Sequence, residues 1–110
     1  MKEYVSVDVE TTGLAPKQDK IIEIGAVRVR DGQIVGSFTC FVNPGRILPA
    51  HITELTGILQ EQVDEAETME SVLPAFLEFA GDLPLMGHRI LFDYGFLKRA
   101  AVNMRLDFER

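Results

Sequence analysis

The sequence comprises 110 residues, 46% of them hydrophobic, which is enough for a single modest core and limits the chain to one domain. Its formal net charge of −6 argues by itself against nucleic-acid binding, which usually needs a basic surface, although bound metal cations would offset part of that charge. Because Cys40 is the single cysteine, an intramolecular disulfide is excluded. No apolar run reaches the length of a membrane span, and no signal peptide precedes the first predicted strand. We therefore expect a cytoplasmic protein without membrane contact.

The first part of the chain has the patterns of β-strands. An apolar run predicts a first strand over residues 4–9, followed by a loop at 11–16 in which glycine and proline break the pattern. A second strand is predicted over 21–30 and a third over 33–42. Because Asp31-Gly32 between them is a strong hairpin signal, we expect these two strands to pair antiparallel.

The pattern then changes to the helical period. A short helix that ends at Gly57 is predicted over residues 50–56, and a further short turn is predicted over 60–64. Apolar residues at helical spacing predict an amphipathic helix over 68–80. Pro74 is unfavourable in its middle, so either the helix begins near Ser71, which would place the proline in the first turn, or the helix kinks.

The last part of the chain predicts one more strand and one more helix. Residues 83–87 are predicted to form a short buried strand, and 91–106 an amphipathic helix. The apolar face of this helix carries Phe92, Phe96, Ala100 and Met104. The predicted order is therefore β-β-β-α-α-β-α, an α/β fold with a mixed sheet.

Two acidic residues, Asp8 and Glu10, interrupt the apolar first strand. Because a strand has a period of two, both carboxylates are predicted to point to one face of the sheet, while Val7 and Val9 point to the other. With Cα atoms about 6.6 Å apart, their charges would repel by about 2.5 kcal/mol at an effective dielectric near 20. We therefore expect a cation beside them, and a hard divalent ion suits oxygen ligands best.

A third acid, Asp93, falls in the first turn of the last predicted helix, directly after the short strand. If that strand lies beside the first one, Asp93 can approach Asp8 and Glu10, and three carboxylates meet at one end of the sheet. Oxygen ligands favour Mg²⁺ or Mn²⁺ over zinc. Two such ions about 3.5–4 Å apart are the usual arrangement for phosphodiester cleavage.

The motifs around these acids resemble those of the DEDD-type 3′–5′ exonucleases of the ribonuclease H-like fold. More narrowly, the chain is similar to the histidine-base branch, typified by the proofreading epsilon subunit of bacterial DNA polymerase III. The matching segments are Asp8–Leu14 (D-x-E-T-T-G-L), 21–27, Asn43-Pro44, 51–58 and Gly87–Leu97. Within the last of them Arg89 stands where asparagine is usual, and it is a candidate phosphate contact.

The resemblance implies roles for individual residues. Asp8, Glu10 and Asp93 would be catalytic ligands of two divalent ions, Mg²⁺ or Mn²⁺. The backbone at Thr11 and Thr12 would hold the terminal 3′ nucleotide, and Leu14 would pack against its base. The substrate-binding set is Thr11, Thr12, Gly13, Leu14, His88 and Phe92. No role follows for Glu23.

The resemblance implies a third motif, H-x-x-x-x-D, some sixty residues beyond the second, which supplies the general base and a fourth ligand. Residues 1–110 end before that position, and the His88–Asp93 segment belongs to the second motif. The only histidines, His51 and His88, both precede Asp93. We therefore expect residues 1–110 to be the N-terminal two-thirds of an exonuclease domain, truncated before the last strand and helix. We also expect little or no nuclease activity from this chain alone.

The function that follows is hydrolysis of phosphodiester bonds at the 3′ end of single-stranded DNA by a metal-dependent 3′–5′ exonuclease. Proofreading beside a DNA polymerase subunit, repair and RNA trimming are all compatible with the motifs, because the sequence does not distinguish DNA from RNA. The alternative is a non-catalytic, nuclease-like module for nucleic-acid binding or assembly, which the missing third motif supports.

Overall fold

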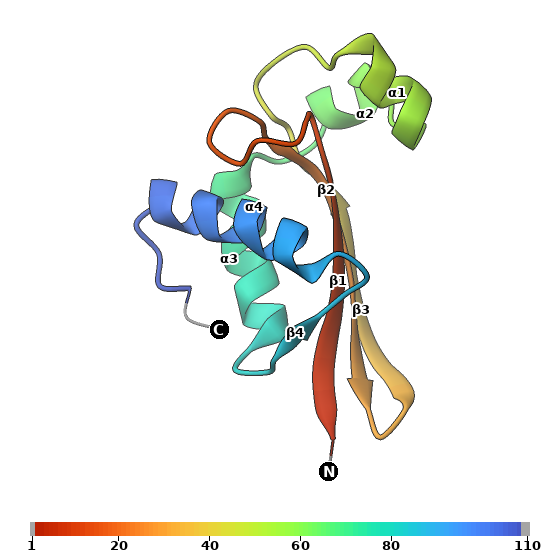
Figure 1. Ribbon diagram of the computed structural model, residues 1–110, viewed down its shortest axis with the longest axis vertical. Coiled ribbons are helices and arrows are strands. Elements are labelled where there is room, and N and C mark those ends of the chain that lie inside the picture. Colours follow the sequence, from red (N-terminus) through yellow and green to blue (C-terminus); the bar gives the residue numbers. More distant parts are fainter. Residues whose placement is uncertain (1, 109–110) are drawn as a thin grey trace.

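A mixed four-stranded sheet forms the centre of the molecule, with strand order β3-β2-β1-β4. The computed structural model describes residues 2–108. Figure 1 shows helices α3 and α4 on the same side of this sheet, and α1 and α2 together at one end. The elements are β1 (Glu3–Thr11), β2 (Ile21–Arg30), β3 (Gln33–Phe41), α1 (Ala50–Thr56), α2 (Gln60–Asp64), α3 (Met69–Ala80), β4 (Leu85–Met86) and α4 (Ile90–Asn103).

The hairpin of β2 and β3 forms as predicted. Both turn residues have positive φ, 50° at Asp31 and 83° at Gly32. Two consecutive positive φ angles belong to the turn type that matches the twist of antiparallel strands, and aspartate and glycine tolerate them best. β2 also pairs antiparallel with β1 along the whole length of β1, whereas β4 pairs parallel with β1 at only two positions.

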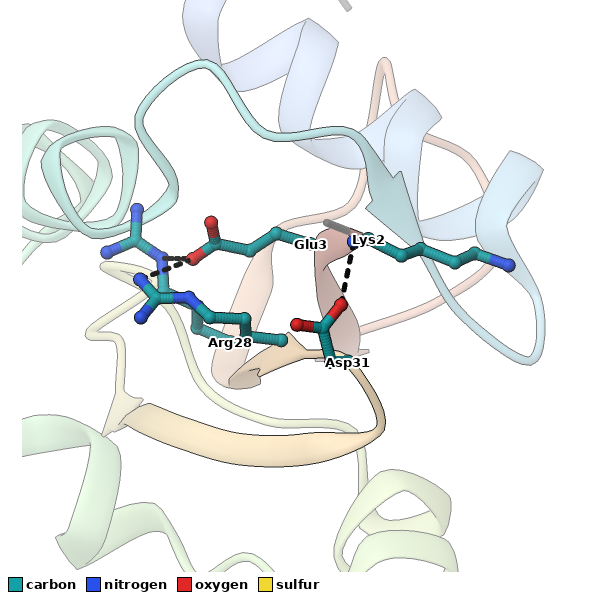
Figure 2. A network of polar contacts seen from close by, with 5 residues as sticks. Lys2, Glu3, Arg28 and Asp31 are labelled. Carbon is teal, nitrogen blue, oxygen red and sulfur yellow. Dashed lines mark hydrogen bonds and ion pairs between the residues drawn. The ribbon is translucent and has the colours of Figure 1, made fainter.

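Charged residues form ion pairs and a hydrogen bond between the start of β1 and the β2–β3 hairpin. Figure 2 shows the Glu3 carboxylate directed at Arg28 and the backbone N–H of Lys2 directed at Asp31. The Glu3 Oε2 atom lies 3.6 Å from Arg28 Nε and 3.4 Å from the Arg30 guanidinium. Lys2 N–H donates to Asp31 Oδ1 at 2.9 Å. These contacts join β1 to the hairpin turn.

The main core lies between the sheet and the two long helices. Alternate residues of β1 face it, because Val5, Val7 and Val9 are buried. The buried residues from the helices are Val72, Leu73, Phe76, Ala80, Phe96, Leu97 and Ala101. Since these come from both α3 and α4, the core fixes the two helices against one face of β1 and β2.

A second, smaller cluster holds α1 and α2 at the end of the sheet. It consists of Ile22, Leu48, Ile52, Ile58 and Val63. α1 ends at Gly57, whose φ of 78° is the left-handed conformation expected for a closing glycine. This cluster anchors the long connection between β3 and α3.

Several sequence predictions need correction. α3 begins at Met69, so the alternative that placed Pro74 in the first turn of a helix beginning near Ser71 is wrong. Pro74 lies inside the helix and is exposed. Residues 60–64 form a helix, which adds α2 to the predicted order. The predicted strand 83–87 is shortened to β4, and it is not buried because it is an edge strand. α4 ends at Asn103, three residues before the predicted end at residue 106.

None of the helices within residues 2–108 has both the length and the apolar character needed to cross a bilayer.

Replacing Phe76 with alanine tests the main core. Phe76 is fully buried, so Phe76→Ala should lower the free energy of unfolding by about 3–5 kcal/mol. Leu55→Ala is the control, because Leu55 is 78% exposed and its loss should change stability by no more than about 0.5 kcal/mol. Urea unfolding followed by circular dichroism measures both values; similar losses for the two variants would contradict the core described here.

Candidate active site

The side chains of Asp8 and Glu10 project from β1 on the face of the sheet opposite to the main core. Val7 and Val9, which alternate with them, are buried, whereas Asp8 is exposed and Glu10 is half-buried. The alternation predicted from the sequence is therefore present in the structure. Across the sheet, Glu10 pairs directly with Glu23 of β2, so a further carboxylate lies beside the predicted pair.

The pairing of β4 with the edge of β1 ends at Met86. Val5 and Ser6 pair with the two residues of β4, and Val5 N–H donates to Pro84 O at 2.9 Å. At the next residue, Gly87, the backbone passes so close to β1 that a Cβ atom would lie 2.5 Å from Val7 O. Only glycine allows this approach, and it directs the following segment over the open edge of β1.

Asp93 occupies the edge that β4 leaves open. It lies in the first turn of α4 and is 1% exposed. Its Oδ1 atom accepts a hydrogen bond from Val9 N–H at 3.3 Å. Val9 N–H therefore has a partner, although β4 is too short to pair with that part of β1. The Oδ2 atom of Asp93 is buried and has no hydrogen-bond partner among the described residues. Such an oxygen is available to a ligand, because an unpartnered buried carboxylate oxygen is costly.

Burial and neighbouring acids raise the pKa values of Glu10 and Asp93. Burial is the largest cause of the raised pKa of Asp93, and the charge of Asp8 adds to it, while the Val9 hydrogen bond and Arg89 act in the opposite direction. The pKa of Glu10 is raised by burial and by the charges of Asp8, Glu23 and Asp93. The three predicted ligands are therefore within electrostatic reach of one another, as the convergence of strand and helix requires.

Glu23 belongs to the same group, although no role for it follows from the sequence. Its pKa is raised by burial and by the charge of Asp8. The signal that was missed is register: Glu23 lies directly opposite Glu10 in the β1–β2 ladder, which only the pairing of the two strands determines.

Arg89 is the cation of this region. Its guanidinium carbon lies 4.4 Å from the centroid of the Phe92 ring, and the Phe92 ring packs 5.0 Å from that of Phe96. Arg89 is exposed and lowers the pKa of both Glu10 and Asp93. The aromatic ring thus holds a positive charge beside the acids, at the position where the sequence departs from the family pattern.

The predicted substrate residues at the end of β1 lie in a hydrogen-bonded loop. Thr11 Oγ1 donates to Gly13 O at 2.6 Å, and Thr12 Oγ1 donates to Asp19 Oδ1 at 3.2 Å. A Cβ atom at Gly13 would lie 2.4 Å from the Asp19 carboxylate, so a larger residue here would have to displace that side chain from its hydrogen bonds. Sequence reasoning missed Asp19, because an acid in a polar loop gives no periodic signal.

The remaining predicted substrate residues differ in exposure. Leu14 is 77% exposed in the loop after β1, and His88 is exposed in the turn before α4. Phe92 is half-buried and contributes to the main core as well as supporting Arg89. Exposure leaves Leu14 and His88 free to contact a substrate, whereas Phe92 already has structural neighbours.

The side chains, as placed, do not form a preassembled metal cage. Within residues 2–108 no group of three or more histidine, cysteine, aspartate or glutamate side chains lies in a metal-binding arrangement. The predicted ligands are the carboxylates of Asp8, Glu10 and Asp93, whose mutual repulsion a cation would relieve.

Comparisons with known proteins agree with these motifs. A family model described as Exonuclease (RNase_T) matches residues 5–109. The DNA polymerase III PolC-type of Clostridium perfringens is 51% identical over 102 residues, which are 93% of this chain and 7% of that protein. A putative bifunctional exonuclease/endonuclease protein of Mycobacterium tuberculosis is 47% identical over 104 residues, 89% of this chain and 16% of that protein. The chain thus spans only a small part of the length of these relatives.

Solved structures show the same fold. E. coli exonuclease I in complex with a dT13 oligonucleotide superposes with a TM-score of 0.85 at 16% identity, covering 97% of this chain and 25% of that one. Exonuclease X in complex with 5′-overhanging duplex DNA gives a TM-score of 0.72 at 29% identity, covering 84% of this chain and 52% of that one. The predicted ribonuclease H-like α/β fold is therefore confirmed.

Gly87→Ala tests the close approach between the chain after β4 and β1. The added methyl group would overlap Val7 O, so we expect a loss of about 1–3 kcal/mol or more in unfolding free energy. Gly95→Ala is the matched control, because its Cβ would meet nothing closer than Pro16 Cγ at 3.7 Å. In α4 that substitution should be neutral or stabilising by up to about 1 kcal/mol. Equal effects in urea unfolding would refute the constraint at Gly87.

Asp93→Asn tests the buried charge. Because the folded-state pKa of Asp93 is raised, the protonated form favours folding, and this contribution is lost as the pH rises through that pKa. In metal-free buffer, the difference in unfolding free energy between the variant and the parent should therefore shift in favour of Asp93→Asn as the pH rises above 3.8, the ordinary pKa of an aspartate. Chemical unfolding at several pH values measures this difference, and a constant difference would contradict it.

Proposed function

Because its residues 5–109 match the RNase_T exonuclease family, this chain belongs to that family, and we propose that it supplies catalytic carboxylates for 3′–5′ hydrolysis of single-stranded DNA. Asp8, Glu10 and Asp93 are the proposed catalytic residues and metal ligands. One observation carries the proposal: Asp93 accepts a hydrogen bond from Val9 N–H through one oxygen, while its second oxygen is buried and has no hydrogen-bond partner among the described residues. Asp8 contributes to the raised pKa of Asp93, and Asp93 contributes to that of Glu10, so the three carboxylates are close enough to interact.

The donor set fits a divalent metal ion. Exonucleases of this kind generally use divalent metals, and the three candidates offer only carboxylate oxygens, which favour Mg²⁺ or Mn²⁺. Two ions bound there would activate water and stabilise the leaving oxygen. The protein's own contribution is to position Asp93 through the Val9 hydrogen bond and to hold Arg89 over Phe92, where its charge can meet a phosphate.

The proposed substrate is the 3′ end of single-stranded DNA. The loop after β1 is fixed by the hydrogen bonds of Thr11 and Thr12, and it presents an exposed Leu14 to a terminal base. Support comes from the complexes of exonuclease I with dT13 and of exonuclease X with 5′-overhanging duplex DNA. Since several relatives are PolC-type DNA polymerases, proofreading beside a polymerase is the proposed context. The same loop geometry is compatible with an RNA end.

A non-catalytic module is the second candidate. It stays open because the two histidines of residues 1–110, His51 and His88, both precede Asp93 and belong to the earlier motifs. For the catalytic candidate, we propose that residues 1–110 correspond to the N-terminal two-thirds of an exonuclease domain. Metal binding separates the two candidates, because only the catalytic one needs it.

Metal binding is tested by titrating the isotopically labelled chain with Mn²⁺. Paramagnetic broadening should concentrate on amides around Asp8, Glu10 and Asp93, because these carboxylates repel one another without a cation. Glu10→Gln and Asp93→Asn should each weaken binding by at least about tenfold, the scale of lost ligand contacts. Glu78→Gln, on the exposed face of α3, is the control. Broadening that is unchanged by the first two variants would count against the site.

Catalysis is tested in two forms of the chain with 5′-labelled single-stranded DNA and Mn²⁺. Residues 1–110 alone should degrade it little or not at all. A fusion to the segment that follows the matching region in the Clostridium perfringens relative should shorten it from the 3′ end. Asp93→Asn in that fusion should reduce the rate by at least about a hundredfold. Robust trimming by residues 1–110, or a fusion indifferent to Asp93→Asn, would overturn the assignment.

A further inference from the structure

The outer edge of β3 is an unprotected strand edge. β3 is the outermost strand of the sheet, at the side away from β4 and Asp93. Its nine residues, Gln33–Phe41, contain no charged residue and no proline. Proteins usually block such edges with lysine, proline or a covering segment, because free backbone groups there pair with other chains. An edge without these features is therefore suited to strand addition.

The backbone groups that point outward can be identified from the ladder. Val42 N–H donates to Ile22 O at 2.8 Å, so residue 42 faces β2. Because hydrogen-bonded and non-hydrogen-bonded positions alternate along an antiparallel pair, Cys40 and Phe38 also face β2. The N–H and C=O groups of Ser37, Thr39 and Phe41 consequently face away from the sheet.

The protein already pairs one position of this outer edge with itself. Asn43 N–H donates to Glu67 O at 2.8 Å, and Asn43 forms a parallel bridge with Thr68. Asn43 has the same parity as Ser37, Thr39 and Phe41, so the bridge lies on the outward edge. The chain then turns into α3 at Met69 and leaves the rest of that edge without a strand partner within residues 2–108.

An apolar groove lies beside the open part of this edge. Its floor includes the half-buried Phe38 and Cys40 of β3, and its wall includes Ser71, Val72 and Ala75 of α3. Phe38 is held in place by Phe76 and Phe79 of α3, with ring centroids 5.8 and 5.6 Å away. The groove thus runs between a strand edge and a helix, which is an arrangement that accepts an extended peptide.

The rim of the groove is acidic. Glu65 and Glu67 line it, both are exposed, and neither forms a salt bridge within the described residues. An occupant with lysine or arginine beside its apolar positions would match this charge, whereas a second copy of a chain with a net charge of −6 would bring two acidic rims together.

We propose that the β3 edge is a docking site for an extended peptide segment of a partner protein. The segment adds a strand outside β3 through Ser37, Thr39 and Phe41, places an apolar side chain between Phe38 and Ala75, and carries basic residues that meet the acidic rim. The site is separate from the carboxylates, so it does not depend on the proposed nuclease function.

Amide hydrogen exchange tests the free edge. In the chain alone, the N–H groups of Ser37, Thr39 and Phe41 should exchange at least about tenfold faster than those of Phe38 and Cys40, which bond to β2. The probe for binding is an acetylated, amidated nine-residue peptide, Lys-Lys-Val-Thr-Val-Thr-Val-Lys-Lys. On addition of this peptide the three outward amides should become protected. Protection of all five amides before the peptide is added would overturn the proposal.

Matched variants test the binding mode by fluorescence anisotropy of the labelled peptide. Thr39→Pro removes an outward N–H that the β2–β3 ladder does not use and should weaken binding at least about tenfold, whereas Thr39→Ala should stay within about twofold. Glu67→Lys, or a peptide with glutamate in place of lysine, should also weaken binding at least about tenfold. Circular dichroism confirms that the variants fold, and an Ala75→Trp variant, which fills the groove, provides a second block if Thr39→Pro does not fold.

Three results would overturn the proposal. The first is failure of the lysine-flanked peptide to bind, and the second is binding that neither Thr39→Pro nor Ala75→Trp weakens. The third is a dimer of the chain in sedimentation experiments that Thr39→Pro dissociates, because this would identify a second copy as the occupant of the edge.

Discussion

The contact between Asp93 and the backbone of Val9 is the constraint on which the site depends. β4 pairs with β1 at only two positions, so the edge of β1 is open where the acidic residues lie. Gly87 brings the chain across that edge, and the first turn of α4 delivers a carboxylate to Val9 N–H. The Asp93 side chain thus accepts the hydrogen bond that a neighbouring strand would otherwise accept from β1. This contact places a residue of α4 beside the acids of the sheet.

In this arrangement the two carboxylate oxygens of Asp93 have different surroundings. Oδ1 accepts a hydrogen bond from a backbone N–H of the sheet, and Oδ2 is buried with no hydrogen-bond partner in the part of the chain that the structure describes. Burial and the charge of Asp8 both raise the pKa of the carboxyl, so the ionised form is held at a cost in stability. Since Glu10 and Glu23 also have raised pKa values, the folded chain holds its acids closer together than stability alone would favour.

The parts of the fold that were predicted correctly have local signals. The period of two in β1 predicts the common face of Asp8 and Glu10, and Asp31-Gly32 predicts the hairpin. The parts that were missed depend on contacts between distant segments. The length of β4 depends on where Gly87 meets β1, and the loop after β1 depends on the Asp19 side chain. Neither leaves a periodic pattern, and the position of Pro74 within α3 shows that packing outweighs local helix preference.

The two edges of the sheet have opposite chemistry. At the β4 edge a buried carboxylate closes the gap in the ladder, while at the β3 edge an uncharged strand leaves its backbone groups exposed. The edges are linked by direct cross-strand neighbours, since Phe41 pairs with Glu23 and Glu23 with Glu10. Coupling between sites needs an element with two arrangements, and a continuous ladder of paired strands provides only one. A partner at β3 would therefore position the proposed site relative to other proteins without altering its acids.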